Sequence, residues 1–88
     1  MADLHIASCI AQVRPTAVHV AIPLIEAITG SAVSARNSSG KLVIVIEGPS
    51  TGALLDQMDQ IRTIAGVLNV EMVYRHAEEE SVMKELLP

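Results

Sequence analysis

The sequence predicts one small α+β domain whose elements run strand, helix, strand, strand, helix, strand. Stretches beginning near residues 4, 41 and 67 are rich in apolar residues, and polar residues such as Ser8 and Gln12 recur at even spacing on one side, as in a strand with two distinct faces. Between these stretches apolar residues recur every three or four positions, as in an amphipathic helix. Gly and Pro separate the segments, so the boundaries are well marked.

The first half of the chain contains the first strand and the first helix. Residues 4–13 are rich in apolar side chains and free of Gly and Pro, which predicts a strand. Pro15 fits the first turn of the following helix, where its missing N–H needs no partner, and Gly30 is a natural stop. Pro23 also removes an N–H from the middle of this helix, so we expect a kink or an early end there.

A hairpin follows, with strands over residues 31–37 and 41–47. The "NSSG" at residues 37–40 supplies the residue types that tight turns use. Ser50 or Thr51 is then expected to cap a second helix that runs through about Ala65. Its buried stripe should consist of Leu54, Met58, Ile61 and Ala65.

The last strand begins after Gly66 and completes the order of a ferredoxin-like βαββαβ fold. We expect a four-stranded antiparallel sheet with both helices on one face, forming a single domain over residues 1–77. Residues 78–88 are an acidic tail in which Val82, Met83, Leu86 and Leu87 have helical spacing. This tail is compatible with a frayed end or with a short docking helix.

Polar residues show which side of each strand the helices leave uncovered. Ser8 and Gln12 mark one side of the first strand, so Ala7, Cys9, Ala11 and Val13 should face the helices. The same reasoning turns Leu42, Ile44 and Ile46, and then Leu68, Val70 and Met72, toward the helices. The opposite side, which we call the open face, then carries Ile6, Ser8, Ile10, Gln12, Val43, Val45, Glu47, Asn69, Glu71 and Val73, with Arg36 and Lys41 at its border.

The open face is too apolar for an ordinary solvated surface. A contiguous apolar patch of a few hundred Å² usually marks an interface, so we expect this face to bind a partner. The pattern is equally compatible with permanent coverage by a second copy of the chain or by the tail.

Charge and composition exclude several classes of function. The net charge is −4, which disfavours nucleic acid as a partner, and the sheet positions that stack RNA bases in related folds hold Ser, Ile, Gln and Val here. The longest apolar run, Leu42–Ile46, is far shorter than the roughly 20 residues of a membrane span. The start of the chain has no Lys or Arg for a secretory signal, and one cysteine forms no internal disulfide. We therefore expect a cytoplasmic protein without membrane insertion.

No residue pattern points to catalysis or to a metal. His5, His19 and His76 lack ligand spacing, and Cys9 is expected to be a small buried hydrophobe. The "EGPSTG" at residues 47–52 lacks the lysine of a phosphate-binding loop.

Three segments together resemble the NapD family: "SCIAQVRP", "SSGKLVIVIEG" and "GVLNVEMVYRHAEEE". The resemblance covers residues 5–80, and its most specific part is the "GVL.V..VY" pattern of residues 66–74. It implies a small cytoplasmic chaperone, with no catalytic residues and no cofactor of its own. Such a chaperone binds the twin-arginine signal peptide of the periplasmic nitrate reductase catalytic subunit and holds back export until the molybdenum cofactor is inserted. The open face is where such a peptide would dock.

Two other functions share the predicted topology. A regulatory domain of the ACT type would need a glycine between the first strand and helix, where this chain has "QVRPT". A homodimeric interaction module would join two open faces, whereas a signal-peptide chaperone is expected to be a monomer or a weak dimer.

Overall fold

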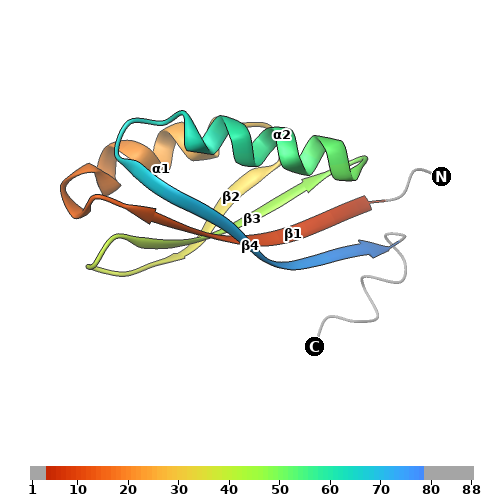
Figure 1. Cartoon of the computed structure of the whole chain (residues 1–88), viewed down its shortest axis with the longest axis horizontal. Coiled ribbons are helices and arrows are strands. Elements are labelled where there is room, and N and C mark those ends of the chain that lie inside the picture. Colours follow the sequence, from red (N-terminus) through yellow and green to blue (C-terminus); the bar gives the residue numbers. More distant parts are fainter. Residues whose placement is uncertain (1–3, 79–88) are drawn as a thin grey trace.

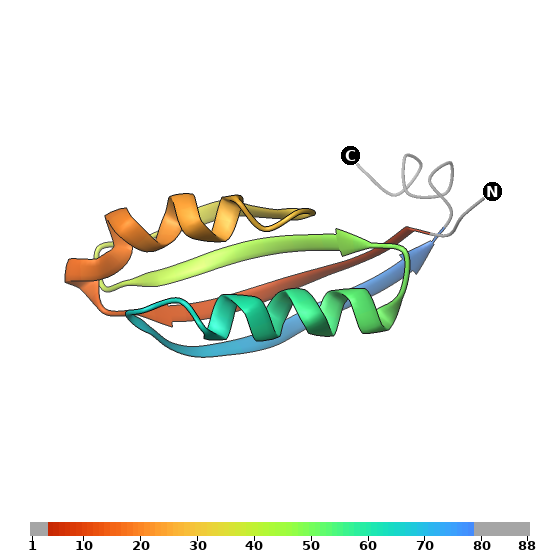
Figure 2. The same cartoon turned by 90° about the horizontal axis from the view of Figure 1, so that it is seen from above.

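The computed structural model describes residues 4–78, with side chains through residue 73, as one sheet covered by two helices (Figure 1). The elements are β1 (Leu4–Val13), a 3₁₀ turn (Pro15–Ala17), α1 (Val18–Glu26), β2 (Ser31–Arg36), β3 (Lys41–Gly48), α2 (Thr51–Arg62) and β4 (Val67–Glu78). The strands lie in the order β2-β3-β1-β4, and each neighbouring pair is antiparallel. Seen from above, α1 lies over the β2 side of the sheet and α2 over the β4 side (Figure 2). The predicted ferredoxin-like fold is confirmed.

The helix boundaries follow local chemistry. The Ser50 hydroxyl accepts a hydrogen bond from the Ala53 N–H at 3.1 Å, which makes Ser50 the N-cap of α2. The predicted end near Ala65 is wrong, because α2 stops at Arg62, and Ala65 is exposed. Of the kink or early end expected at Pro23, an end at Pro23 itself is not found, because α1 continues to Glu26 and stops short of Gly30.

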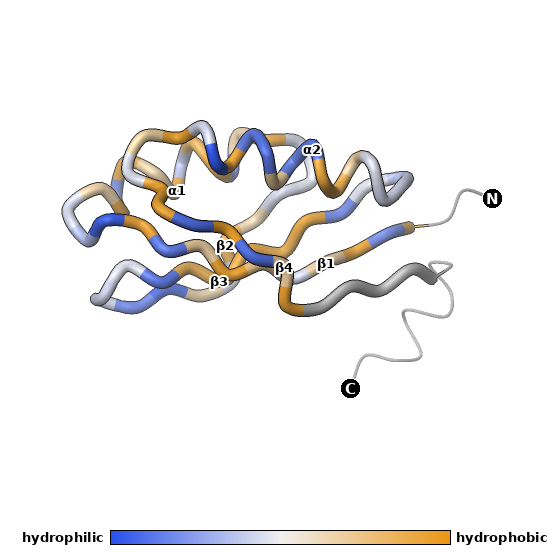
Figure 3. Tube along the Cα trace, in the orientation of Figure 1, coloured by the Kyte–Doolittle hydropathy of each residue, from blue (hydrophilic) through white to orange (hydrophobic). Residues whose placement is uncertain are grey.

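The core lies between the sheet and the helices and is entirely aliphatic apart from sulfur side chains. All the predicted inward residues of β1 and β3 are fully buried, as are Leu54 and Ile61 of α2. The core consists of Ala7, Cys9, Ala11, Val13, Ala21, Ile25, Leu42, Ile44, Ile46, Leu54, Met58, Ile61 and Val70. The tube in Figure 3 shows how hydrophobic residues recur along the central strands.

Two bulges in β4 correct the alternation predicted for this strand. Gln12 pairs with Asn69 and Val13 with Val67, so Leu68 has no partner on β1. As a result Val67 packs against the core, whereas Leu68 is 58% exposed rather than buried as predicted. A second bulge leaves Val73 unpaired between Met72 and Tyr74.

A third irregularity lies in the edge strand β2. Val33 pairs with Ile44 and Ala35 with Val43, so Ser34 is the extra residue. The shift places Arg36 opposite the buried Leu42, on the helix side of the sheet. Arg36 therefore does not border the open face as the alternation predicted.

Candidate functional site

The open face is built from cross-strand rows of residues. Val45 pairs with Ser8 of β1 and with Ala32 of β2. In the next row, Val43 pairs with Ile10 and Ala35, and Ile10 pairs in turn with Glu71. Because directly paired residues point to the same side of a sheet, the rows form one continuous surface across all four strands.

The pairing register brings together the residues predicted for this face except Val73, which lies unpaired at a bulge beside it. Ile6, Ser8, Ile10, Gln12, Val43 and Val45 are partly buried, although both helices lie on the other side of the sheet. Glu47, Asn69, Glu71 and Val73 are exposed, and Val73, at its bulge, is 56% exposed.

On β2, the sequence prediction missed two small residues of this face. Ala32 and Ala35 of β2 extend the rows of Val45 and Val43 to the sheet edge. Only the bulge at Ser34 places both alanines on the same side, and no sequence signal marks that bulge. Their short side chains leave room above β3 for a partner to approach.

Glu47 is held rigidly at one end of the face. Its backbone N–H donates to the Gly30 carbonyl at 2.9 Å, and its carbonyl accepts from Nε2 of the buried Gln57 at 2.8 Å. The same Nε2 donates to the Thr29 carbonyl at 2.8 Å. Because the loop at Gly30 and Gln57 of α2 both hold this backbone, the Glu47 side chain leaves the sheet from a fixed point.

At the other end of the face, the polar side chains of Gln12 and Asn69 make hydrogen bonds within the sheet and its turn. Gln12 Nε2 donates to the Ser39 carbonyl at 2.9 Å and so ties the turn between β2 and β3 to β1. Asn69 Nδ2 donates to the Glu71 carboxylate at 3.3 Å. Lys41 pairs with Gln12 in this row, so the face is basic at the Lys41 corner and acidic at Glu47.

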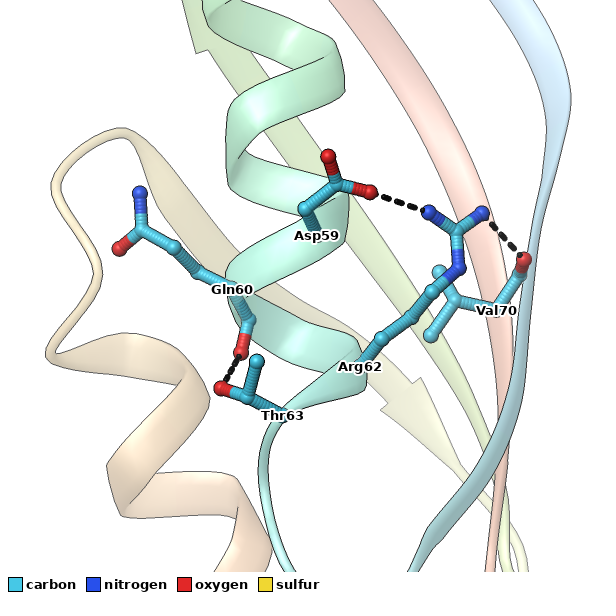
Figure 4. Close-up of polar contacts among 5 residues, drawn as sticks. All are labelled: Asp59, Gln60, Arg62, Thr63 and Val70. Atoms are coloured by element: carbon cyan, nitrogen blue, oxygen red, sulfur yellow. Dashed lines mark hydrogen bonds and ion pairs between the residues drawn. The ribbon is translucent and has the colours of Figure 1, made fainter.

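The two sheet edges are protected by side chains from the helices. The Glu26 carboxylate of α1 accepts from the Val33 N–H of β2 at 3.3 Å. Arg62 of α2 donates to the Val70 carbonyl of β4 at 3.1 Å and forms an ion pair with Asp59 at 2.8 Å (Figure 4). Occupied backbone groups and bulges both discourage the addition of another strand, so the open face is the surface better suited to a partner.

Outside the open face, few described residues have side chains suited to metal binding or catalysis. Within residues 4–78, no three His, Cys, Asp or Glu residues gather as metal ligands, and no helix is long and apolar enough to cross a membrane. Cys9 is a free, buried thiol, and burial raises its pKa, an effect that the positive charge of Arg62 partly offsets. A protonated, inaccessible thiol is a poor nucleophile.

Comparisons with known proteins agree with the sequence resemblance. The family model described as "NapD protein" matches residues 4–79. "Chaperone NapD" of Haemophilus influenzae is 28% identical over 80 residues, which is 90% of this chain and 86% of that protein. "Chaperone NapD" of Escherichia coli is 36% identical over 42 residues, 48% of each chain.

A solved structure supports the same assignment. The solution structure of the E. coli Tat proofreading chaperone protein NapD matches with a TM-score of 0.77 and 27% identity, covering 88% of this chain and 81% of that one. The family model, the relatives and the shared fold lead to one conclusion: this chain belongs to the NapD family of chaperones.

Proposed function

We propose that this chaperone binds the twin-arginine signal peptide of the periplasmic nitrate reductase catalytic subunit precursor in the cytoplasm. Binding would hold back export until the cofactor has been inserted and the precursor has folded. The observation that carries the proposal is the open face itself, an apolar surface that neither helix covers. The name of the E. coli relative, a Tat proofreading chaperone, supports the same class of partner.

The chemistry of the open face suits a peptide that is basic at one end and mildly apolar beyond it. Such a peptide folds readily into an amphipathic helix, whose apolar side would lie on Ile10, Val43 and Val45. Its arginines would pair with Glu47, opposite Ile6, or with Glu71, opposite Ile10, since a guanidinium makes two charge-assisted hydrogen bonds to a carboxylate.

The apolar contacts should supply most of the affinity. Exposed ion pairs contribute only about 0–1 kcal/mol each, so the two carboxylates chiefly set the direction in which the peptide lies. The fixed backbone of Glu47 favours this role, because it sets the point from which the carboxylate leaves the sheet.

The apolar character of the open face also favours a second candidate, a homodimer joined through two such faces. Light scattering after gel filtration separates the two possibilities. A monomer at micromolar concentration leaves the face free for a peptide, whereas a tight dimer would block it.

Backbone amide NMR tests the proposal directly. Labelled protein is titrated with a synthetic twin-arginine signal peptide of the nitrate reductase and, as a control, with the peptide in which both arginines are glutamine. We expect shifts concentrated at the open-face residues of β1, β3 and β4, with weaker binding of the control. Absence of binding at high micromolar peptide by a folded monomer would reject the proposal.

A further inference from the structure

We propose that residues 79–88 of this chain dock on its own open face and compete there with the signal peptide. The competition rests on the proposed function, because it concerns regulation of the proposed peptide site. Docking of residues 79–88 can be tested without any peptide. Residues 79–88 lie outside the described residues, and they follow directly on Glu78, the last residue of β4.

The last described residue lies beside the open face. Glu78 pairs with Leu4 at the start of β1, two residues before Ile6. Ile6 pairs with Glu47, the residue that forms the acidic end of the face. The segment that follows Glu78 therefore starts beside the Glu47 end.

The segment is long enough to cover the apolar centre. From Leu4 to Ile10 the sheet spans about 20 Å at roughly 3.3 Å per residue. Ten residues span about 33 Å when extended and about 15 Å as a helix. Residues 79–88 therefore reach the apolar rows of the face in a mainly extended or a partly helical form.

The sequence of the segment matches the surface. Val82, Met83, Leu86 and Leu87 fall within one stripe of a helix, and Lys84 and Glu85 lie off that stripe. An apolar stripe of this kind suits the half-buried side chains of the open face, and methionine adapts well to irregular apolar surfaces. Residues 79–88 therefore carry an apolar stripe that can cover the apolar centre of the open face.

Charge makes this docking weak and easy to reverse by a basic peptide. Glu79 and Glu80 follow Glu78 directly and would crowd against Glu47 when the segment is docked. The arginines of a signal peptide would pair with the same acidic corner and relieve that repulsion. The docked segment lowers the apparent affinity of every peptide that must displace it by the same factor, so the arginines add their own contacts without changing that factor.

A tethered segment competes at a fixed effective concentration of about 1 mM. If its own dissociation constant for the face is about 0.1–1 mM, the face is blocked half to nine-tenths of the time. Removing the segment should then strengthen peptide binding about two- to tenfold.

The test compares the full chain with a chain ending at Glu78, which keeps all the described elements. A spin label attached through Pro88→Cys should broaden the amide signals of Ile10, Val43 and Val45 in the free protein, and Cys9 should stay unlabelled because it is fully buried. The double variant Met83→Asp, Leu86→Asp should remove the broadening, whereas Glu85→Gln, off the stripe, should keep it.

The outcomes separate this inference from the proposed function. Broadening of the open face in the full chain, with no peptide binding by either the full chain or the chain ending at Glu78, would support docking and reject the signal-peptide function. Equal peptide affinity of the full and shortened chains, together with no broadening, would overturn docking and leave the signal-peptide function standing.

Discussion

Replacing Val45 with aspartate should abolish peptide binding while leaving the fold intact. Val45 lies at the centre of the open face, between Ser8 and Ala32, and is already partly buried in the free protein. Full burial of a valine side chain contributes about 1.5 kcal/mol or more, so the partner gains about 1 kcal/mol from the part still exposed. A carboxylate without a hydrogen-bond partner under an apolar peptide costs roughly 2 kcal/mol or more.

Together these terms give a loss of about 3 kcal/mol, or at least about 100-fold in the dissociation constant. Val45→Thr keeps the shape of the side chain and should cost only about 1 kcal/mol, or about fivefold, for its buried hydroxyl. Leu55→Asp is the matched control. Leu55 lies on α2, is 50% exposed, and belongs to the helix side of the sheet, so binding should not change.

Isothermal titration calorimetry with the twin-arginine peptide measures these affinities. Thermal unfolding by circular dichroism must accompany it, because aspartate within a strand costs about 1 kcal/mol of stability. If Val45→Asp unfolds cooperatively and still binds within about threefold of the parent, the peptide does not lie on the open face and the reasoning fails.

Three further predictions follow from single contacts. Glu71→Gln should weaken peptide binding by no more than about 1 kcal/mol and flatten its salt dependence; an unchanged salt slope in a titration series would remove Glu71 from the arginine contact. Ser50→Ala removes the cap at the Ala53 N–H and should cost about 1 kcal/mol in urea unfolding, whereas no loss would show that the cap contributes nothing. Burial raises the pKa of Cys9 above its unfolded value, so stability should be fully present below about pH 8.5 and fall as the pH rises; chemical denaturation from pH 7 to 10 should lose this slope in Cys9→Ala.

The sequence was sufficient to predict the core of β1 and β3, because Ser8 and Gln12 in β1, and Lys41 and Glu47 in β3, all mark the side that faces away from the helices. Ser8 and Gln12 identified one side of β1, and the opposite side proved to be fully buried. The turn between β2 and β3 was also predictable. The side chain of Asn37 accepts from the N–H groups of Ser39 and Lys41, as expected of an asparagine that opens a turn.

The outer strands were less predictable, since a single extra residue reverses every side chain beyond it. Bulges at Ser34 and Leu68 moved Arg36 to the helix side and turned Val67 inward. Bulges of this kind are frequent at sheet edges, where they increase the local twist. No local residue pattern predicts them here. The centre of the open face was therefore predictable from sequence, whereas its border on β2 required the pairing register.

On each edge strand a helix side chain already occupies one backbone group, which favours the open face over an edge as the binding place of the proposed peptide. An extended peptide added beside β4 would have to displace Arg62 from the Val70 carbonyl, and one beside β2 would displace Glu26 from the Val33 N–H. Each displacement gives up a charge-assisted hydrogen bond before any new contact forms. On the open face, by contrast, the peptide meets half-buried aliphatic side chains that have no competing partner among the described residues. The same side chains that close the edges thus favour recognition through the face.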